Sequence, residues 1–194
     1  MKIDLKYIDE EDKCYGLTGV AMSAVIWDME NLISAISIDS DAVNSIRYTP
    51  QLILNGNAAI SPRNILNHNI EKYRMAMGMI LSNILCRTYV LNNKFINHKT
   101  KQQIYDFFIE EGKINCDLEK DEVEVIFNKN YDYLHRIFSH PEVQRIAHDF
   151  AQLLTARRTL SQAEIIEALQ PLNMLQNRFI THNKHYKPMK LIGL

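Results

Sequence analysis

The sequence predicts an all-α fold, a single-domain bundle of about six to seven helices around one long central helix. The 194 residues include only six glycines and five prolines. That is too few for a β-sandwich or barrel, in which a turn follows about every ten residues. Long segments instead carry apolar residues at helical spacing. We expect one helical domain over residues 1–180, followed by a basic C-terminal tail over residues 181–194.

The first predicted helix runs from Tyr15 to roughly Ala35, because this stretch is mostly apolar and uninterrupted by proline. Gly16, Gly19 and Ser23 form a small-residue side of this helix. Small side chains let a second backbone approach closely. We therefore expect this side to permit close approach of another backbone segment.

A short helix and an extended segment are expected next. The residues from Asp39 to Asp41 offer N-caps for a short helix through Ile46. Pro50 interrupts the stretch from Tyr48 to Leu54 and favours an extended conformation there.

The long central helix is expected between Ser61 and Asn93. Ser61 can cap it, and Pro62 fits the first turn because an N–H there would have no helical partner. Asn92 and Asn93 provide a stop. At 1.5 Å per residue, the span from Pro62 to Leu91 would measure about 45 Å. Along one side of this helix, apolar residues recur every three or four positions and form a helix-pairing seam: Leu66, Ile70, Tyr73, Met77, Ile80 and Ile84.

Two further helices are expected before residue 139. Residues from Thr100 to Glu111 carry an apolar stripe, and Gly112 is a suitable residue to end that helix. Residues from Val123 to Phe138 favour a helix, although the alternation over 122–127 also permits a strand.

Two capping boxes predict the last helix starts. Ser139-x-x-Glu142, with Pro141 in the first turn, opens one amphipathic helix. Ser161-x-x-Glu164 opens another at Gln162. Pro171 is expected to end or restart that helix.

Composition and charge limit the function classes. The three cysteines are odd in number and far apart, which excludes a disulfide framework and favours a reducing cytoplasm. The apolar run from Cys14 to Trp27 is shorter than the ~20 residues of a membrane helix. Net charge is −1. Residues 1–60 hold four basic and nine acidic side chains, whereas residues 151–194 hold six basic and two acidic ones.

Histidines and methionines are the residues of this chain most suited to a chemical site. The dipeptide His148-Asp149 is similar to the metal-binding dipeptide of HD phosphohydrolases. Such a site also needs an earlier histidine and a later aspartate, and no aspartate follows Asp149. We expect His148 and Asp149 to face solvent and His135 to lie at the edge of the core. The methionines at 75, 77 and 79 point in different helical directions and favour core packing. The sequence predicts no catalytic residue, no metal site and no cofactor.

Nucleic-acid binding is one alternative function. It would use the basic C-terminal part of the chain, with Pro171 separating two short helices as in a helix-turn-helix. The candidate contacts are Arg157, Arg158, Arg178, Lys184, Lys187 and Lys190. The modest positive charge argues against this interpretation.

We expect a cytoplasmic, non-enzymatic interaction or regulatory module that binds a protein partner or a second copy of itself. The seam on the long helix calls for a partner helix, although a helix of the same chain would satisfy it equally well. A nucleic-acid-binding regulator is the first alternative, and a metal-dependent HD-like phosphohydrolase is the second.

Overall fold

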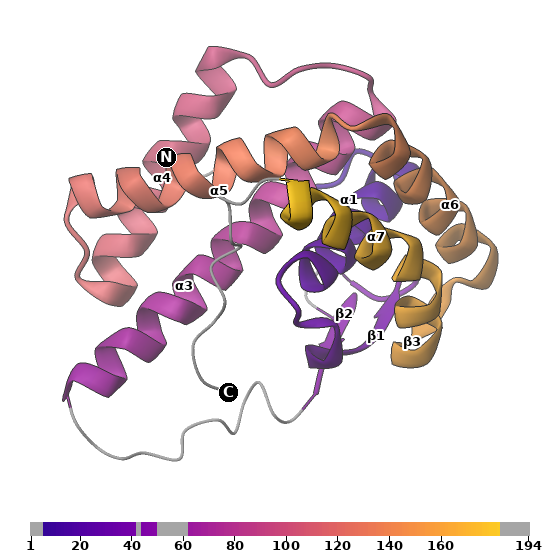
Figure 1. The fold of residues 1–194 in the computed structure, drawn as a ribbon, viewed down its shortest axis with the longest axis horizontal. Helices are drawn as coiled ribbons and strands as arrows, with labels where there is room; N and C mark the ends of the chain where they lie inside the picture. Colours follow the sequence, from indigo (N-terminus) through magenta and orange to yellow (C-terminus); the bar gives the residue numbers. More distant parts are fainter. Residues whose placement is uncertain (1–5, 42–43, 50–61, 183–194) are drawn as a thin grey trace.

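The computed structural model describes residues 6–41, 44–49 and 62–182, and the side chains of residues 69–175 within the last range. The predicted all-α helical bundle is confirmed (Figure 1). Its α-helices are α1 (Glu10–Ile26), α3 (Pro62–Leu85), α4 (His98–Cys116), α5 (Lys120–Phe138), α6 (Pro141–Arg157) and α7 (Gln162–His182). Ser61 and the tail from residue 183 lie outside the described residues.

The helix at the centre of the bundle is α1, and the longer α3 packs along it. Every side chain of α1 from Cys14 to Ile26 is buried, whereas α3 exposes Lys72 and Ala76. Helix α1 packs against α3, α6 and α7. A helix that is apolar on all sides is expected to be covered on all sides. The central position predicted for the long helix therefore belongs to α1.

Helix α1 ends earlier than predicted, and a strand follows it. Asp28 adopts a left-handed conformation with φ of 56° just after the helix, and a 3-10 turn η1 (Glu30–Leu32) leads into strand β1 (Ile33–Ser37). Left-handed residues commonly end helices. The prediction of a helix through Ala35 is therefore wrong beyond Ile26.

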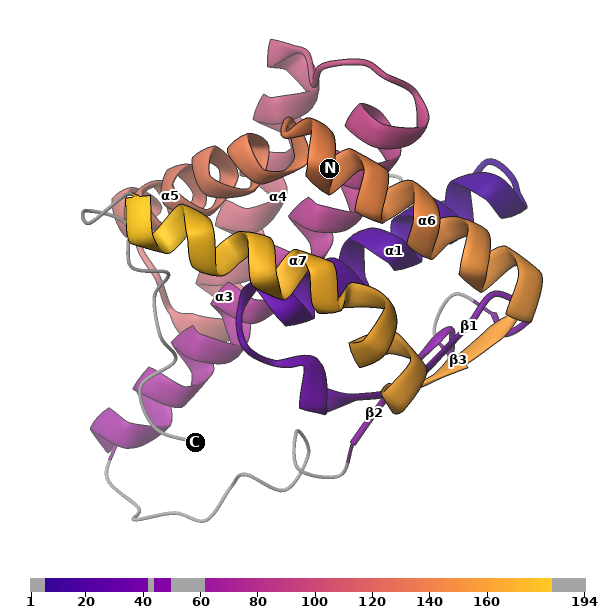
Figure 2. The same ribbon diagram turned by 45° about the vertical axis from the view of Figure 1, so that its right-hand side comes forward.

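A small antiparallel sheet lies at one end of the bundle (Figure 2). Strand β1 is its middle strand, between β2 (Ile46–Tyr48) and β3 (Thr159–Ser161). Ile36 pairs with Ile46 on one side and with Leu160 on the other. The predicted short helix through Ile46 is wrong at that residue, whereas an extended Tyr48 is confirmed; the predicted extended residues from Pro50 lie outside the described ranges.

Helix α3 continues without a break into a π-helix, η2 (Cys86–Leu91). Asn92 caps its end, and Asn93 is left-handed with φ of 48°. The predicted stop at these asparagines is confirmed. The wider π winding was not predicted, and such turns often occur at functional sites.

Helices α4 and α5 pack closely where Gly112 faces α5. The prediction that Gly112 ends α4 is wrong, because the helix continues to Cys116 and is capped by Asp117 with φ of 54°. A Cβ added at Gly112 would lie 2.8 Å from a methyl group of Val123. The glycine therefore permits close approach of α5. The predicted helix from Val123 to Phe138 is confirmed within α5.

The capping box predicted for the start of α6 is wrong, because it places Ser139 at the N-cap. The N-cap of α6 is His140, and Ser139 is the C-cap of α5.

The start of α7 is confirmed. The backbone N–H of Ser161 donates to the Glu164 carboxylate at 2.8 Å, as the capping box predicts. Pro171 does not end or restart the helix, which continues to His182. Three buried leucines pack the helical turns before and after Pro171 against the core: Leu169, Leu172 and Leu175. The break required for a helix-turn-helix is therefore absent from the described α7.

Candidate functional site: a groove between α3 and α4

Much of the predicted pairing seam on α3 packs against other helices of the same chain. Tyr73 and Met77 are buried in the main core. Ile70, Ile80 and Ile84 are half-buried against that core, and the side chain of Leu66 lies outside the described residues. Helices α1, α4 and α5 all pack against α3. The seam therefore explains the packing of the bundle, but it is not completely covered.

A cavity of about 340 Å³ remains where α3 passes α4. Three seam residues, Tyr73, Met77 and Ile80, line it from α3, and Phe107 and Phe108 line it from α4. The volume lies at the lower end of the range for ligand-binding pockets. We call this cavity the α3–α4 groove. It is the part of the seam that the helices within the described residues leave open.

The floor of the groove is held in place by specific contacts. The Tyr73 hydroxyl donates a hydrogen bond of 2.6 Å to the Phe108 carbonyl, and the two rings pack edge to face at 6.4 Å. Burial raises the pKa of Tyr73, so the phenol stays protonated and remains a donor. On the inner side, the Asn130 amide lies 3.4 Å from the sulfur of Met77. The groove is therefore preformed in the folded chain.

The rim of the groove is polar. Lys72 is exposed on α3, and Glu111 is half-buried on α4. The Asn115 amide donates to the Glu111 carboxylate at 2.9 Å and holds it in position. The groove thus carries a positive group on one helix and a negative group on the other. An apolar floor with a polar rim is the usual arrangement of a protein-binding surface.

Cys116 lies at one end of the groove, where its thiol donates to the Asn69 carbonyl at 3.4 Å. Burial raises the pKa of this thiol. Because the thiolate is the nucleophilic form, a raised pKa makes Cys116 a poor nucleophile.

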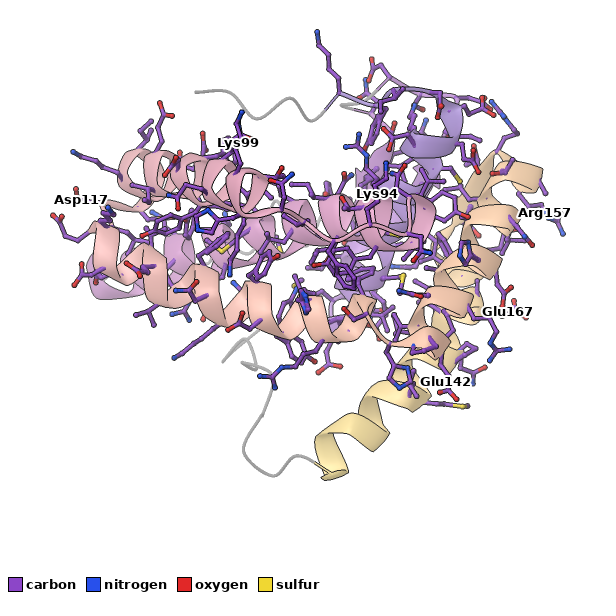
Figure 3. The ribbon with its side chains drawn as sticks, turned by 90° about the horizontal axis from the view of Figure 1, so that it is seen from above. Lys94, Lys99, Asp117, Glu142, Arg157 and Glu167 are labelled. Carbon is purple, nitrogen blue, oxygen red and sulfur yellow. The ribbon has the colours of Figure 1, made fainter. Side chains whose placement is uncertain are left out.

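Of the six predicted nucleic-acid contacts, the structure describes the side chains of Arg157 and Arg158. Arg157 is exposed at the end of α6 (Figure 3). Arg158 donates to Glu10 at 2.6 and 2.9 Å and to Asp39 at 3.0 Å, so two carboxylates neutralise it. It ties the end of α6 to the start of α1. The side chain of Arg178 and the whole of Lys184, Lys187 and Lys190 lie outside the described residues.

The histidines are placed differently from one another. His148 does not face solvent as predicted, because its Nδ1 lies 2.6 Å from the hydroxyl of Tyr15 on α1. His135 is half-buried with its ring 5.3 Å from Tyr89, which confirms its predicted place at the edge of the core. Among the described residues, no group of three or more His, Cys, Asp or Glu side chains could hold a metal ion.

The contribution of α4 to the groove could not be read from the sequence. The apolar stripe containing Phe107 and Phe108 was recognisable, but the helix that it faces was not. Glu111 and Asn115 are spaced one turn apart on the same side as Phe107, which is the sequence signal that could have identified the rim.

In the described part of the chain, none of the helices is both long and apolar enough to cross a bilayer. Comparison of this chain with protein-family models, curated proteins and solved structures gave no match.

Proposed function

We propose that this protein is a cytoplasmic, non-enzymatic interaction module that binds an amphipathic segment of a protein partner in the α3–α4 groove. The observation that carries the proposal is the preformed apolar cavity of about 340 Å³ left open along the seam of α3. A helix seam whose apolar side chains are only partly covered favours an additional helix.

The chemistry of the groove defines the partner. Apolar side chains one helical turn apart would pack on Ile80 and Phe107, the half-buried apolar residues that line the groove. A carboxylate of the partner would face Lys72, and a basic group would face Glu111. We therefore propose a short helix with an apolar face and charges of both signs beside it.

The cytoplasmic assignment is supported by cysteine chemistry. Cys14, Cys86 and Cys116 are all unpaired and buried. Secreted domains of this size commonly use cysteines in disulfides, whereas free buried thiols are typical of reducing compartments.

The test is a selection of displayed random peptides for binding to the folded protein, followed by measurement of their affinities for two variants. Ala76 is exposed and lines the groove, so Ala76→Trp fills the groove without entering the core. Ala156 is exposed on α6 and provides the matched control Ala156→Trp. We expect amphipathic peptides whose affinity falls about tenfold or more with Ala76→Trp and is unchanged with Ala156→Trp. Peptides that bind both variants equally would contradict the proposal.

A further inference from the structure

Each wall of the α3–α4 groove is a stripe of residues four positions apart on one helix. Residues at this spacing lie one above the other on the same side of a helix. The stripe of α3 consists of Lys72, Ala76 and Ile80. The stripe of α4 consists of Phe107, Glu111 and Asn115. A segment bound in the groove therefore lies between these two stripes.

The two stripes run in opposite directions. The Cys116 thiol of α4 donates to the Asn69 carbonyl of α3 at 3.4 Å, and the Tyr73 hydroxyl of α3 donates to the Phe108 carbonyl of α4 at 2.6 Å. The step forward along α3 from Asn69 to Tyr73 is thus a step back along α4 from Cys116 to Phe108. The two helices are therefore antiparallel where they form the groove.

The antiparallel arrangement gives the groove an apolar end and a polar end. Ile80 and Phe107, both half-buried against the core, lie together at one end. Lys72 and Asn115 lie at the other end. Glu111 lies between them, one helical turn or about 6 Å along α4 from Phe107. A bound helix therefore meets apolar surface at one end and the Glu111 carboxylate one turn further on.

The two charges of the groove are not equivalent. Glu111 is half-buried, and the Asn115 amide donates to its carboxylate at 2.9 Å and to its backbone carbonyl at 3.0 Å. Lys72 is exposed, and its long side chain must lose rotamer freedom to form an ion pair. A charge that is already held in place beside apolar surface loses less entropy on binding and is screened less by salt. Glu111 is therefore the stronger electrostatic determinant.

We propose that Glu111 determines which partners bind in the groove. It selects a lysine or arginine that lies three or four positions from the apolar residue packed on Ile80 and Phe107. Asn115 is a positioning residue, because its amide fixes the Glu111 carboxylate. An acidic residue opposite Lys72 contributes little, as exposed ion pairs do. This inference rests on the proposed groove function and makes its partner more specific.

The experiment repeats the peptide selection on the full chain and on two variants of Glu111. Peptides selected on the wild type should carry Lys or Arg three or four positions from an apolar residue, and Glu111→Gln should weaken their binding about tenfold. Glu111→Lys should select Asp or Glu at the same spacing. The matched control is Glu110→Gln, because Glu110 is exposed on α4 and is not among the residues that line the groove. This control removes the same charge and should leave the affinities unchanged.

A double-mutant cycle tests the role of Asn115. Asn115→Ala keeps the charge of Glu111 but frees its carboxylate, so the selected peptides should bind about threefold more weakly. Replacing the basic residue of the peptide by alanine should remove the effects of both Glu111→Gln and Asn115→Ala, because the interaction that they disturb is then absent. A purely structural role of Asn115 would weaken both peptides alike and would contradict its assignment as a positioning residue.

Two results would overturn the proposal, and they differ in what else they overturn. Peptides that are weakened by Ala76→Trp but carry no basic residue at this spacing, or that bind Glu111→Gln as tightly as the wild type, would overturn the role of Glu111 and leave the groove function standing. A selection that yields no peptide sensitive to Ala76→Trp would overturn the groove function and this inference together.

Discussion

Gly19 of α1 packs directly on the backbone of Ser82 in α3. A Cβ added at Gly19 would lie 2.2 Å from the Ser82 carbonyl oxygen, far inside contact distance. The two helices therefore touch backbone to backbone at this point. This contact places α3 along the central helix and fixes which side of α3 faces α4. The shape of the α3–α4 groove thus depends on a residue that does not line it.

Replacing Gly19 by alanine should lower the free energy of unfolding by about 3 kcal/mol, because the backbone of α3 must move to make room. Urea denaturation measures the change. The matched control is Gly78→Ala, where the added Cβ would meet only the Trp27 side chain, at 2.6 Å. An indole ring can shift more readily than a helix backbone, so this variant should lose distinctly less stability. Equal losses in the two variants would mean that the close approach at Gly19 does not limit packing.

The buried ion pair between Asp12 and Arg87 joins the start of α1 to η2. The side chains are only 6% and 14% exposed, and the Arg87 Nε donates to Asp12 at 2.6 Å. Replacing Arg87 by methionine leaves a buried carboxylate without its partner and should cost about 3 kcal/mol of stability. Arg158→Met, which breaks exposed pairs with Glu10 and Asp39, should cost less. If the two losses measured by denaturation are the same, burial does not strengthen the Asp12 pair.

Asp12 should also make stability depend on pH. Burial alone would raise the pKa of Asp12, but hydrogen bonds from Arg87 and from the Ile8 N–H outweigh it and lower the pKa below its usual value. The ionised carboxylate therefore stabilises the folded state above about pH 4, the unfolded pKa, and this contribution is lost as pH falls through the lower folded pKa.

The pH effect is measured as the difference in free energy of unfolding between the wild type and Asp12→Asn. We expect a constant difference near neutral pH that shrinks below about pH 4. Comparison with the variant cancels the other acidic groups, such as Glu164, whose pKa is lowered by hydrogen bonds from Ser161. A difference that stays constant down to strongly acidic pH would contradict the assignment.

Pro171 should be a destabilising residue that the fold tolerates. It lies inside α7, where it cannot donate a helical hydrogen bond and its ring crowds the preceding turn. Pro171→Ala should raise the free energy of unfolding by about 1 to 3 kcal/mol. Pro141→Ala provides the control, because Pro141 lies in the first turn of α6, where proline costs little. A lower melting temperature for Pro171→Ala than for the wild type would show that the proline is needed where it stands.

Local signals in the sequence were sufficient where a feature depends on neighbouring residues. The capping box of Ser161 and Glu164 predicted the start of α7, because both partners lie within one turn. The small side of α1 predicted close approach of another backbone, and at Gly19 that backbone is the one of α3 at Ser82. The spacing of apolar residues along α3 predicted which of its side chains pack against other helices. Two of them, Tyr73 and Met77, are buried in the core.

Features that depend on distant residues could not be predicted in this way. Strand β1 continues the apolar pattern that follows α1, and it becomes a strand because Ile36 pairs with Leu160 across more than a hundred residues. His148 lies on the polar side of α6, yet Tyr15 from α1 covers it. Pro171 is a helix breaker by itself, but the buried leucines on both sides of it hold α7 together.

By itself the sequence determined the helical class, most helix positions and the apolar stripes of α3 and α4, because hydrophobic periodicity and caps act within a few residues. Only the tertiary structure decided which helix is central and which part of the α3 seam stays open as a groove. These properties are set by contacts between segments far apart in the chain. Such contacts depend on how all helices bury their apolar side chains together, which a pattern within a few residues does not show.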